Sequence, residues 1–154
     1  MSTADSTKKQ FAIQQIVMHN TEFIRHSVEG LKQTEWKPNA KLEVNTRHKN
    51  LSNDEHEMTL IFALHVSLEE TNIFTVKYEQ TGIFLLKHLT SEEEKLTLNV
   101  TCLQLLYPYA AEGINNLIYR AGYPPLYLAP IDFNQMHQQR EQQKIASHDA
   151  VQMN

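Results

Sequence analysis

The stretch EHEMTLIFALHVS, residues 55–67, carries the clearest pattern in the sequence. Every second position from Met58 to Val66 is apolar, whereas the positions between them mix polar side chains with Ile61 and Ala63. A period of two residues is typical of a β-strand that turns one face toward a core. The stretch therefore predicts a strand with one buried and one more polar side.

Comparable alternation flanks this strand, at residues 11–23, 41–47 and 74–86. In the first of these segments the phase shifts near Gln14 and Gln15, which predicts a β-bulge. In the last, Gly82 interrupts the alternation, which predicts a second bulge or a bend. Strands joined mostly by short polar turns predict a four-stranded antiparallel sheet with one apolar face.

After the sheet the apolar period changes from 2 to 3.6 residues. The sequence SEEE at residues 91–94 predicts a capping box at a helix start. Apolar residues at helical spacing continue to Ala121, and Gly122 predicts the helix end. Pro108 predicts a kink or a break within this helix. The predicted fold class is α+β: a four-stranded antiparallel sheet packed by a long kinked helix plus a C-terminal helix.

The composition predicts a single domain at residues 11–145, between a disordered leader at 1–10 and a disordered tail at 146–154. The leader is polar and contains no apolar stretch of the kind found in signal peptides. The longest purely apolar run, residues 60–64, is far below the ~20 residues that span a bilayer. With a single cysteine, Cys102, no intrachain disulfide can form, which favours a reducing compartment and a cytoplasmic protein.

Charge and motif content argue against several function classes. The formal net charge is −4, so nucleic acid is a poor candidate partner. The four glycines form no phosphate-binding loop, and Cys102 among apolar neighbours predicts an inert thiol. Eight histidines are dispersed without His-x-His or His-x3-His spacing. We therefore predict neither an enzyme nor a cofactor or metal site.

Several large apolar residues fall in segments that these patterns do not bury. They are Trp36 in the first long loop, Tyr123, Leu126, Tyr127 and Leu128 in a proline-rich extended segment, and Phe133 and Met136 on a polar helix predicted to start at Asp132. One interpretation is that they anchor loops or contact another subunit. The other is that they line a groove for apolar stretches of a second polypeptide. The composition leaves both interpretations open.

Five blocks of the sequence resemble the SecB family of protein-export chaperones. LLYPYAAE at 105–112 resembles the family's helix motif, and GYPPLYLAPIDF at 122–133 resembles its loop into the last helix. Three further blocks, FAIQQI at 11–16, WKP at 36–38 and QTGIF at 80–84, keep the family's order and approximate spacing. The resemblance extends from about residue 11 to residue 137.

The resemblance implies an ATP-independent holdase that keeps unfolded precursor proteins export-competent in the cytoplasm and delivers them to the SecA translocation ATPase. It also implies a homotetramer built as a dimer of dimers, without a cofactor. The family's client groove carries over to Trp36, Tyr123, Tyr127, Phe133 and Met136. Its tetramer contacts carry over to Val76, Tyr78, Gln80, Leu106 and Tyr109.

On the outer sheet face the chain departs from the family pattern. Where family members usually carry acidic residues for SecA, this chain has Asn20, Ile24 and Lys77, with Thr75 beside them. A lysine in place of a carboxylate repels a basic partner. The departures favour an alternative, a SecB-like chaperone for non-export clients such as a toxin–antitoxin pair. An enzyme or ligand-binding protein on a similar scaffold is a third hypothesis.

Overall fold

The computed structural model describes residues 8–28 and 35–152, which form one sheet and a set of helices. The elements, in chain order, are β1 (Gln10–Arg25), β2 (Asn39–Asn50), β3 (Glu55–Leu68), β4 (Thr71–Lys87), α1 (Ser91–Leu96), a π-helical turn (Thr97–Thr101), α2 (Cys102–Arg120) and α3 (Phe133–Gln152). The order of strands before helices agrees with the predicted α+β class.

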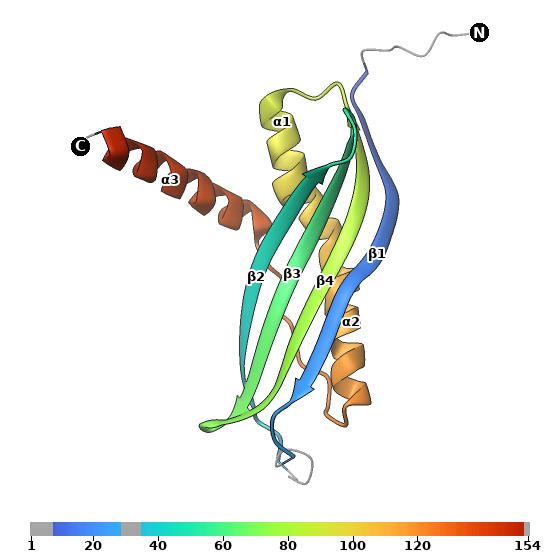
Figure 1. Ribbon diagram of the computed structural model, residues 1–154, viewed down its shortest axis with the longest axis vertical. Coiled ribbons are helices and arrows are strands. Elements are labelled where there is room, and N and C mark those ends of the chain that lie inside the picture. The colour runs from blue at the N-terminus through green and yellow to red at the C-terminus, as the bar shows by residue number, and fades with distance from the viewer. Residues whose placement is uncertain (1–7, 29–34, 153–154) are drawn as a thin grey trace.

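The four strands form a single antiparallel sheet in the order β1-β4-β3-β2. The sheet is long and twisted, and α1 and α2 run along one of its faces, whereas α3 projects away from it (Figure 1). We call the helix-covered face the inner face and the opposite one the outer face. Because β4 and β3 lie in the middle of the strand order, β1 and β2 are the two edge strands.

The core lies between the inner face and α2. The alternation that predicted β3 is confirmed, because Met58, Leu60, Phe62, Leu64 and Val66 are all buried. The inner positions of β4 and the buried side of α2 complete this core, with Phe74, Val76, Phe84, Leu103, Leu106, Ala110, Ile114 and Ile118. Burying one such side chain contributes about 1.5–3 kcal/mol, so this layer is the main source of stability.

Two predictions about irregular strands had different outcomes. The pairing of β1 with β4 shifts between Ile13 and Gln15, which confirms the predicted bulge, and shifts again between Met18 and Asn20. The bulge or bend predicted at Gly82 was wrong, because the β3–β4 register passes through this glycine without a shift. A Cβ at Gly82 would crowd the Phe84 ring and Leu106. The glycine therefore lets α2 approach the sheet.

The capping box lies one residue before its predicted position. Thr90 is the N-cap: its hydroxyl accepts a hydrogen bond from the Glu93 N–H at 3.1 Å, and the Glu93 carboxylate accepts one from the Thr90 N–H at 3.1 Å. The sequence fits either register, since both Thr90 and Ser91 are followed three residues later by a glutamate.

Helical structure continues through Pro108, which lies inside α2 and does not split it. The departure from α-helical geometry lies upstream, at the π-helical turn Thr97–Thr101. Gly122 ends the helix as predicted, with a φ of 100°, while the Tyr123 N–H donates to the Ile118 carbonyl at 3.1 Å.

α3 begins where the sequence predicted. The Asp132 carboxylate accepts a hydrogen bond from the Gln135 N–H at 2.9 Å and so caps the helix. The backbone of α3 extends to Gln152, past residue 145 where we expected the ordered domain to end. Of the expected leader, residues 1–7 lie outside the described residues, and Gln10 already opens β1.

Candidate functional site

Four aromatic rings from distant parts of the chain stack at one end of the sheet. The ring centroids of Phe23 and Phe74 lie 5.1 Å apart, those of Phe74 and Tyr123 4.9 Å, and those of Tyr123 and Trp36 5.0 Å. We call this row the aromatic stack. It connects β1 and β4 with Trp36 and with the segment after α2, so it holds Trp36 and the start of that segment against the core.

The stack is held from the side by Arg25 at the end of β1. Its Nη1 donates to the Tyr123 hydroxyl at 2.5 Å and its Nη2 to the Ala121 carbonyl at 2.6 Å. The guanidinium carbon lies 5.2 Å from the centroid of the Tyr123 ring, within cation–π range. No feature of the sequence indicated this role for Arg25.

Residues 121–132, which we call the connecting segment, are tied to α2 by side chains. The Asn115 amide accepts from the Leu126 N–H at 2.8 Å and donates to the Leu126 carbonyl at 3.0 Å. The Tyr107 hydroxyl donates to the Ala129 carbonyl at 2.5 Å. These contacts satisfy backbone groups that have no strand partner, and so they hold an extended chain without a sheet.

A second aromatic contact fixes the start of α3. The Phe133 ring meets Tyr107 edge-on at 6.1 Å, and Tyr107 meets Phe62 at 6.0 Å. Phe133 is buried, and Met136 is partly buried against the core. Beyond this first turn, the Arg140 guanidinium donates to the Thr46 hydroxyl at 3.2 Å.

The five residues expected to line an open groove differ widely in exposure. The expectation of exposure was wrong for Tyr123 and Phe133, which are 2% and 1% exposed. The reason is that hydrogen bonds from Arg25 and α2 draw the connecting segment down onto the core. Tyr127 is 85% exposed. Trp36 and Met136 are partly buried, and only Trp36 joins Tyr123 in the aromatic stack.

Trp36 also carries an unusual polar atom. Its Nε1 is buried and has no hydrogen-bond partner among the residues that the structure describes. An unsatisfied buried donor costs about 1–3 kcal/mol.

Four of the five predicted subunit contacts lie inside the protomer. Val76, Tyr78, Gln80 and Leu106 are all buried between the sheet and α2. This contradicts direct contact of these side chains with a second copy. Successive side chains of a strand point to opposite faces of the sheet, and the even-numbered positions of β4, which include Val76, Tyr78 and Gln80, point toward α2. Tyr109 is 53% exposed and is free for such a contact.

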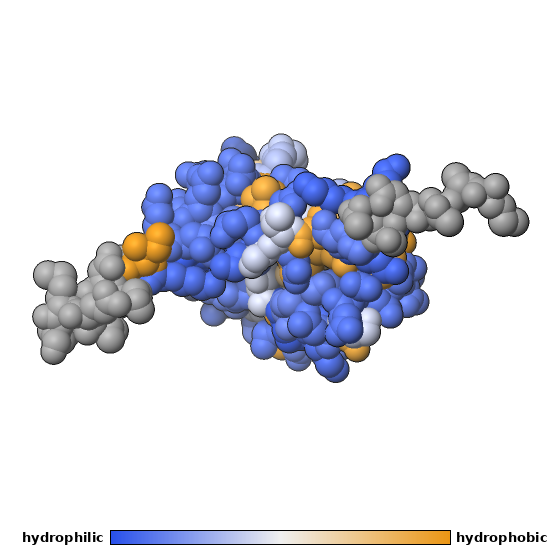
Figure 2. Space-filling view, turned by 90° about the horizontal axis from the view of Figure 1, so that it is seen from above, coloured by the Kyte–Doolittle hydropathy of each residue, from blue (hydrophilic) through white to orange (hydrophobic). Residues whose placement is uncertain are grey.

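The side of β1 nearest α2 carries apolar surface that the sequence analysis missed. Phe11, Ile13 and Met18 pair with inner-face positions of β4, but they are 40%, 46% and 55% exposed. They are uncovered because α2 lies mainly over β3 and β4. Seen from the end at which α1 lies, apolar patches interrupt an otherwise hydrophilic surface (Figure 2).

The positions expected to dock SecA do lie together on the outer face. Ile24 pairs with Thr75, and Lys77 pairs with Glu22. Asn20 pairs with Glu79, which also forms an ion pair with Arg47 at 3.1 Å. Lys77 is therefore bordered by carboxylates, so the face keeps some negative charge around it.

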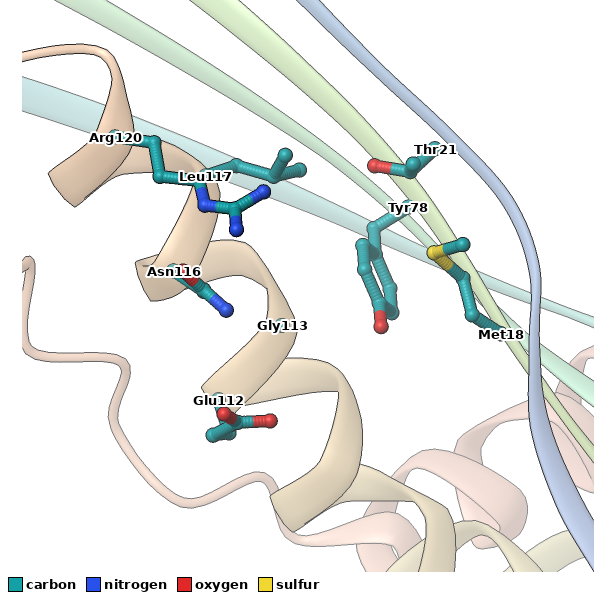
Figure 3. A pocket seen from close by; sticks show the side chains of 8 residues that line it. All are labelled: Met18, Thr21, Tyr78, Glu112, Gly113, Asn116, Leu117 and Arg120. Atoms are coloured by element: carbon teal, nitrogen blue, oxygen red, sulfur yellow. The ribbon is translucent and has the colours of Figure 1, made fainter.

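A cavity of about 290 Å³ lies between β1 and α2. Figure 3 shows its lining, which consists of Met18, Thr21, Tyr78, Glu112, Gly113, Asn116, Leu117 and Arg120. A Cβ built on Gly113 would overlap the Tyr78 hydroxyl, so this tyrosine requires a glycine in the helix above it. Burial and the nearby Glu112 carboxylate raise the pKa of Tyr78.

Among the described residues, the titratable groups show no arrangement that suits catalysis. Burial raises the pKa of Cys102 to about 12, so its thiol stays protonated at neutral pH. His48 Nε2 lies 2.9 Å from His56 Nδ1, and burial together with the His56 charge lowers the pKa of His48. Within residues 8–28 and 35–152, no three His, Cys, Asp or Glu residues are placed to hold a metal ion, and no helix is long and apolar enough to cross a membrane.

Comparison with known proteins gives a consistent result. The family described as preprotein translocase subunit SecB matches residues 4–144. A protein-export protein SecB of Pseudomonas paraeruginosa is 34% identical over 137 residues, which are 88% of this chain and 84% of that protein. The protein of the same name from Ectopseudomonas mendocina is 33% identical over 150 residues, which are 97% of this chain and 93% of that protein.

A solved structure shares the fold. It is a SecB-like chaperone of Mycobacterium tuberculosis in complex with a peptide from an antitoxin. The TM-score is 0.62 at 21% sequence identity, and the match covers 79% of this chain and 90% of that chain.

Proposed function

The chain belongs to the SecB family of non-enzymatic chaperones of protein export, and from this premise we propose that it is an ATP-independent holdase for unfolded precursor proteins in the cytoplasm. The observation that carries the proposal is the connecting segment, residues 121–132. It is apolar and extended, is held to α2 by a few side-chain hydrogen bonds, and exposes Tyr127.

We propose that clients bind along this segment, in contact with Tyr127, Trp36 and Met136. Tyr123 and Phe133 join the contact only when the segment moves, since both are buried in the structure described above. Nε1 of Trp36 is also buried, so it would donate to a backbone carbonyl of the client only after the segment moves. A donor of this kind suits any sequence, because every peptide unit offers a carbonyl.

The energetics suit a nucleotide-independent holdase. Burying ~1,000 Å² of apolar client surface contributes about 25 kcal/mol. Ordering the client and losing its translational freedom offset much of this contribution. Because apolar contact is non-directional, binding is expected to be reversible and loosely specific.

Suppression of aggregation of a reduced, unfolded client by stoichiometric amounts of the protein tests the proposal. We expect suppression by the native chain and a dissociation constant about tenfold higher for Tyr127→Ala. Leu51→Ala is a matched control, because Leu51 is an exposed apolar residue outside the connecting segment. No suppression by the native chain would overturn the proposal, and an equal effect of both substitutions would overturn the assigned site.

Delivery to SecA is the finer part of the proposal, with docking on the outer face around Asn20, Ile24, Thr75 and Lys77. Glu22 and Glu79 beside Lys77 support a residual attraction for a basic partner. The alternative is a chaperone for non-export clients, and it is favoured by Lys77 itself. Binding to SecA at low salt separates the two, because its complete absence would leave only the alternative.

We also propose that the chain assembles as a homotetramer, a dimer of dimers. The exposed apolar side chains of β1 and Tyr109 of α2 support an assembly that covers this side.

A further inference from the structure

A row of polar side chains crosses the outer face, which is the face turned away from α1 and α2 (Figure 1). His26 follows directly after β1, and its Nε2 lies 2.9 Å from the Thr75 hydroxyl of β4. The same hydroxyl lies 3.5 Å from Nδ1 of His65 on β3, and His65 Nε2 lies 3.7 Å from the Glu43 carboxylate of β2. We call these four residues the histidine row. It places one imidazole ring on each side of a single hydroxyl.

The strand register positions the row. Thr75 is the direct partner of Ile24 on β1 and of His65 on β3. Beyond the end of β1, the His26 N–H donates to the Ile73 carbonyl at 2.7 Å, so the chain continues alongside β4 and the His26 ring reaches Thr75. Both rings remain accessible, because His26 is exposed and the His65 side chain is 44% exposed.

The Glu43 carboxylate gives the row a direction. A carboxylate only accepts hydrogen bonds, so it favours the His65 tautomer that carries its proton on Nε2 and leaves Nδ1 as an acceptor. The Thr75 hydroxyl then donates to this Nδ1, while its oxygen accepts a hydrogen bond from His26 Nε2. In this arrangement both rings are neutral, and each can still take up one proton.

The fixed charges around the row balance one another. The described residues of the four strands place three carboxylates here, each beside a cation: Glu22 with Lys77, Glu43 with Lys41, and Glu79 with Arg47. Arg25 turns to the inner face, where it binds Tyr123, and Glu69 and Glu70 lie in the turn between β3 and β4. The charge of the strand surface around Thr75 is therefore set by the two imidazole rings.

We propose that the histidine row is a proton-operated switch on the docking face, which weakens the binding of a basic partner as the pH falls. The inference rests on the proposed docking of SecA at this face and adds its regulation. Imidazole is the side chain whose charge ordinarily changes between pH 5 and 8. When both rings are neutral, the carboxylates of the face attract basic side chains. When both are protonated, two further positive charges flank Thr75 and repel them.

The shared hydroxyl couples the two rings. Once Nδ1 of His65 carries a proton, it donates to the Thr75 oxygen, and the hydroxyl proton has to turn away from it. Thr75 is itself one of the proposed docking positions. Protonation therefore changes the hydrogen bonding of the docking surface as well as its charge. Because both rings are accessible to water, the effect is moderate and is screened by salt.

Binding of the full-length chain to SecA at low salt, at about pH 8 and about pH 5.5, tests the switch. We expect binding to be about tenfold weaker at the lower pH. SecA carries titratable groups of its own, so the ratio of the two dissociation constants is compared between variants. The double variant His26→Gln with His65→Gln should lose most of this ratio. His65→Lys carries a fixed charge and should bind about threefold more weakly than the native chain at about pH 8.

His137→Gln is the matched control, because it removes an imidazole from α3, outside the sheet, and should keep the native ratio. A second readout uses the chain without SecA. NMR of the imidazole nitrogens at about pH 8 should find the proton of His65 on Nε2, and a proton on Nδ1 would overturn the row. If a glutamine variant fails to fold by circular dichroism, His26→Asn and His65→Asn take its place.

The possible failures are distinguishable. A native chain that shows the same pH dependence of SecA binding as the double variant would overturn the switch and leave the docking intact. A native chain that binds no SecA at either pH would overturn the docking and the switch with it. A His137→Gln variant that loses the ratio to the same extent as the double variant would also overturn the assignment to the histidine row.

Discussion

The guanidinium of Arg25 and the phenol of Tyr123 form a clamp between the edge strand and the turn after α2. Nη1 lies 2.5 Å from the Tyr123 hydroxyl, and the same side chain also bonds to the Ala121 carbonyl at 2.6 Å. Because Tyr123 lies in the aromatic stack, this clamp holds the connecting segment against the core. Opening the proposed client site therefore requires breaking it.

Removing the Tyr123 hydroxyl tests the clamp. Tyr123→Phe should lower the free energy of unfolding by about 1 kcal/mol, because one hydrogen bond to a charged donor is lost from a partly exposed site. It should also tighten client binding, since the segment opens more easily. Urea unfolding and client titration measure the two effects. Tyr119→Phe is the matched control, with a tyrosine that is 70% exposed. Weaker client binding at unchanged stability would contradict the clamp.

The close approach of the Tyr78 side chain to Gly113 predicts that a Gly→Ala substitution here lowers stability instead of raising it. Gly→Ala inside a helix normally stabilises by up to about 1 kcal/mol. Gly113→Ala should instead destabilise by about 1–3 kcal/mol, because the new methyl group overlaps the Tyr78 hydroxyl. Thermal unfolding of Gly113→Ala, Tyr78→Val and the double variant forms a cycle. The two substitutions should cost less together than their sum, and simple additivity would contradict the overlap.

The pair of His48 and His56 predicts a loss of stability in acid. Burial and the His56 charge lower the pKa of His48 below 6.5 in the folded chain. Because the pKa of His48 is lower in the folded than in the unfolded chain, its neutral imidazole contributes to the stability of the fold above pH 6.5. This contribution is lost as the pH falls through the pKa of His48 in the folded chain. His48→Gln should flatten this part of the stability profile, whereas His19→Gln, at an exposed position of β1, should not. Identical profiles for His48→Gln and the native chain would contradict the prediction.

The positive charge of Lys77 on the outer face predicts that replacing it by a carboxylate strengthens binding to SecA. Lys77→Glu should strengthen binding because a repulsive charge on the outer face becomes attractive, and the effect should shrink as salt rises. Lys41→Glu makes the same change at an exposed position of β2 on the same face, where no docking is proposed. Isothermal titration at low and moderate salt measures both. No difference between Lys77→Glu and the native chain would mean that this face does not dock SecA.

The elements of the fold could be predicted from the sequence because their signals are local. Alternation fixed the inner face of β3, and Gly122 marked the end of α2. Gly82 was misread because a bend and a close approach of two elements both require glycine. The choice between them depends on Leu106, which is distant in the sequence.

The candidate site was harder to predict because it depends on contacts between residues that are distant in the sequence. Tyr123 lies in a segment with no periodic pattern, and its burial depends on Arg25, 98 residues earlier. No pattern in a single sequence shows that the Asn115 amide bonds to the backbone of Leu126. Tyr127, for which no such hydrogen bond is found among the described residues, is the predicted groove residue that is clearly exposed.

Trp36 is the only tryptophan in the chain, so its fluorescence reports directly on the proposed client site. Titration with an unfolded client that lacks tryptophan measures whether the ring that stacks on Tyr123 changes its surroundings on binding. We expect a saturable change in Trp36 emission with the same midpoint as aggregation suppression. Full suppression of aggregation without any change in that emission would contradict client binding at the connecting segment.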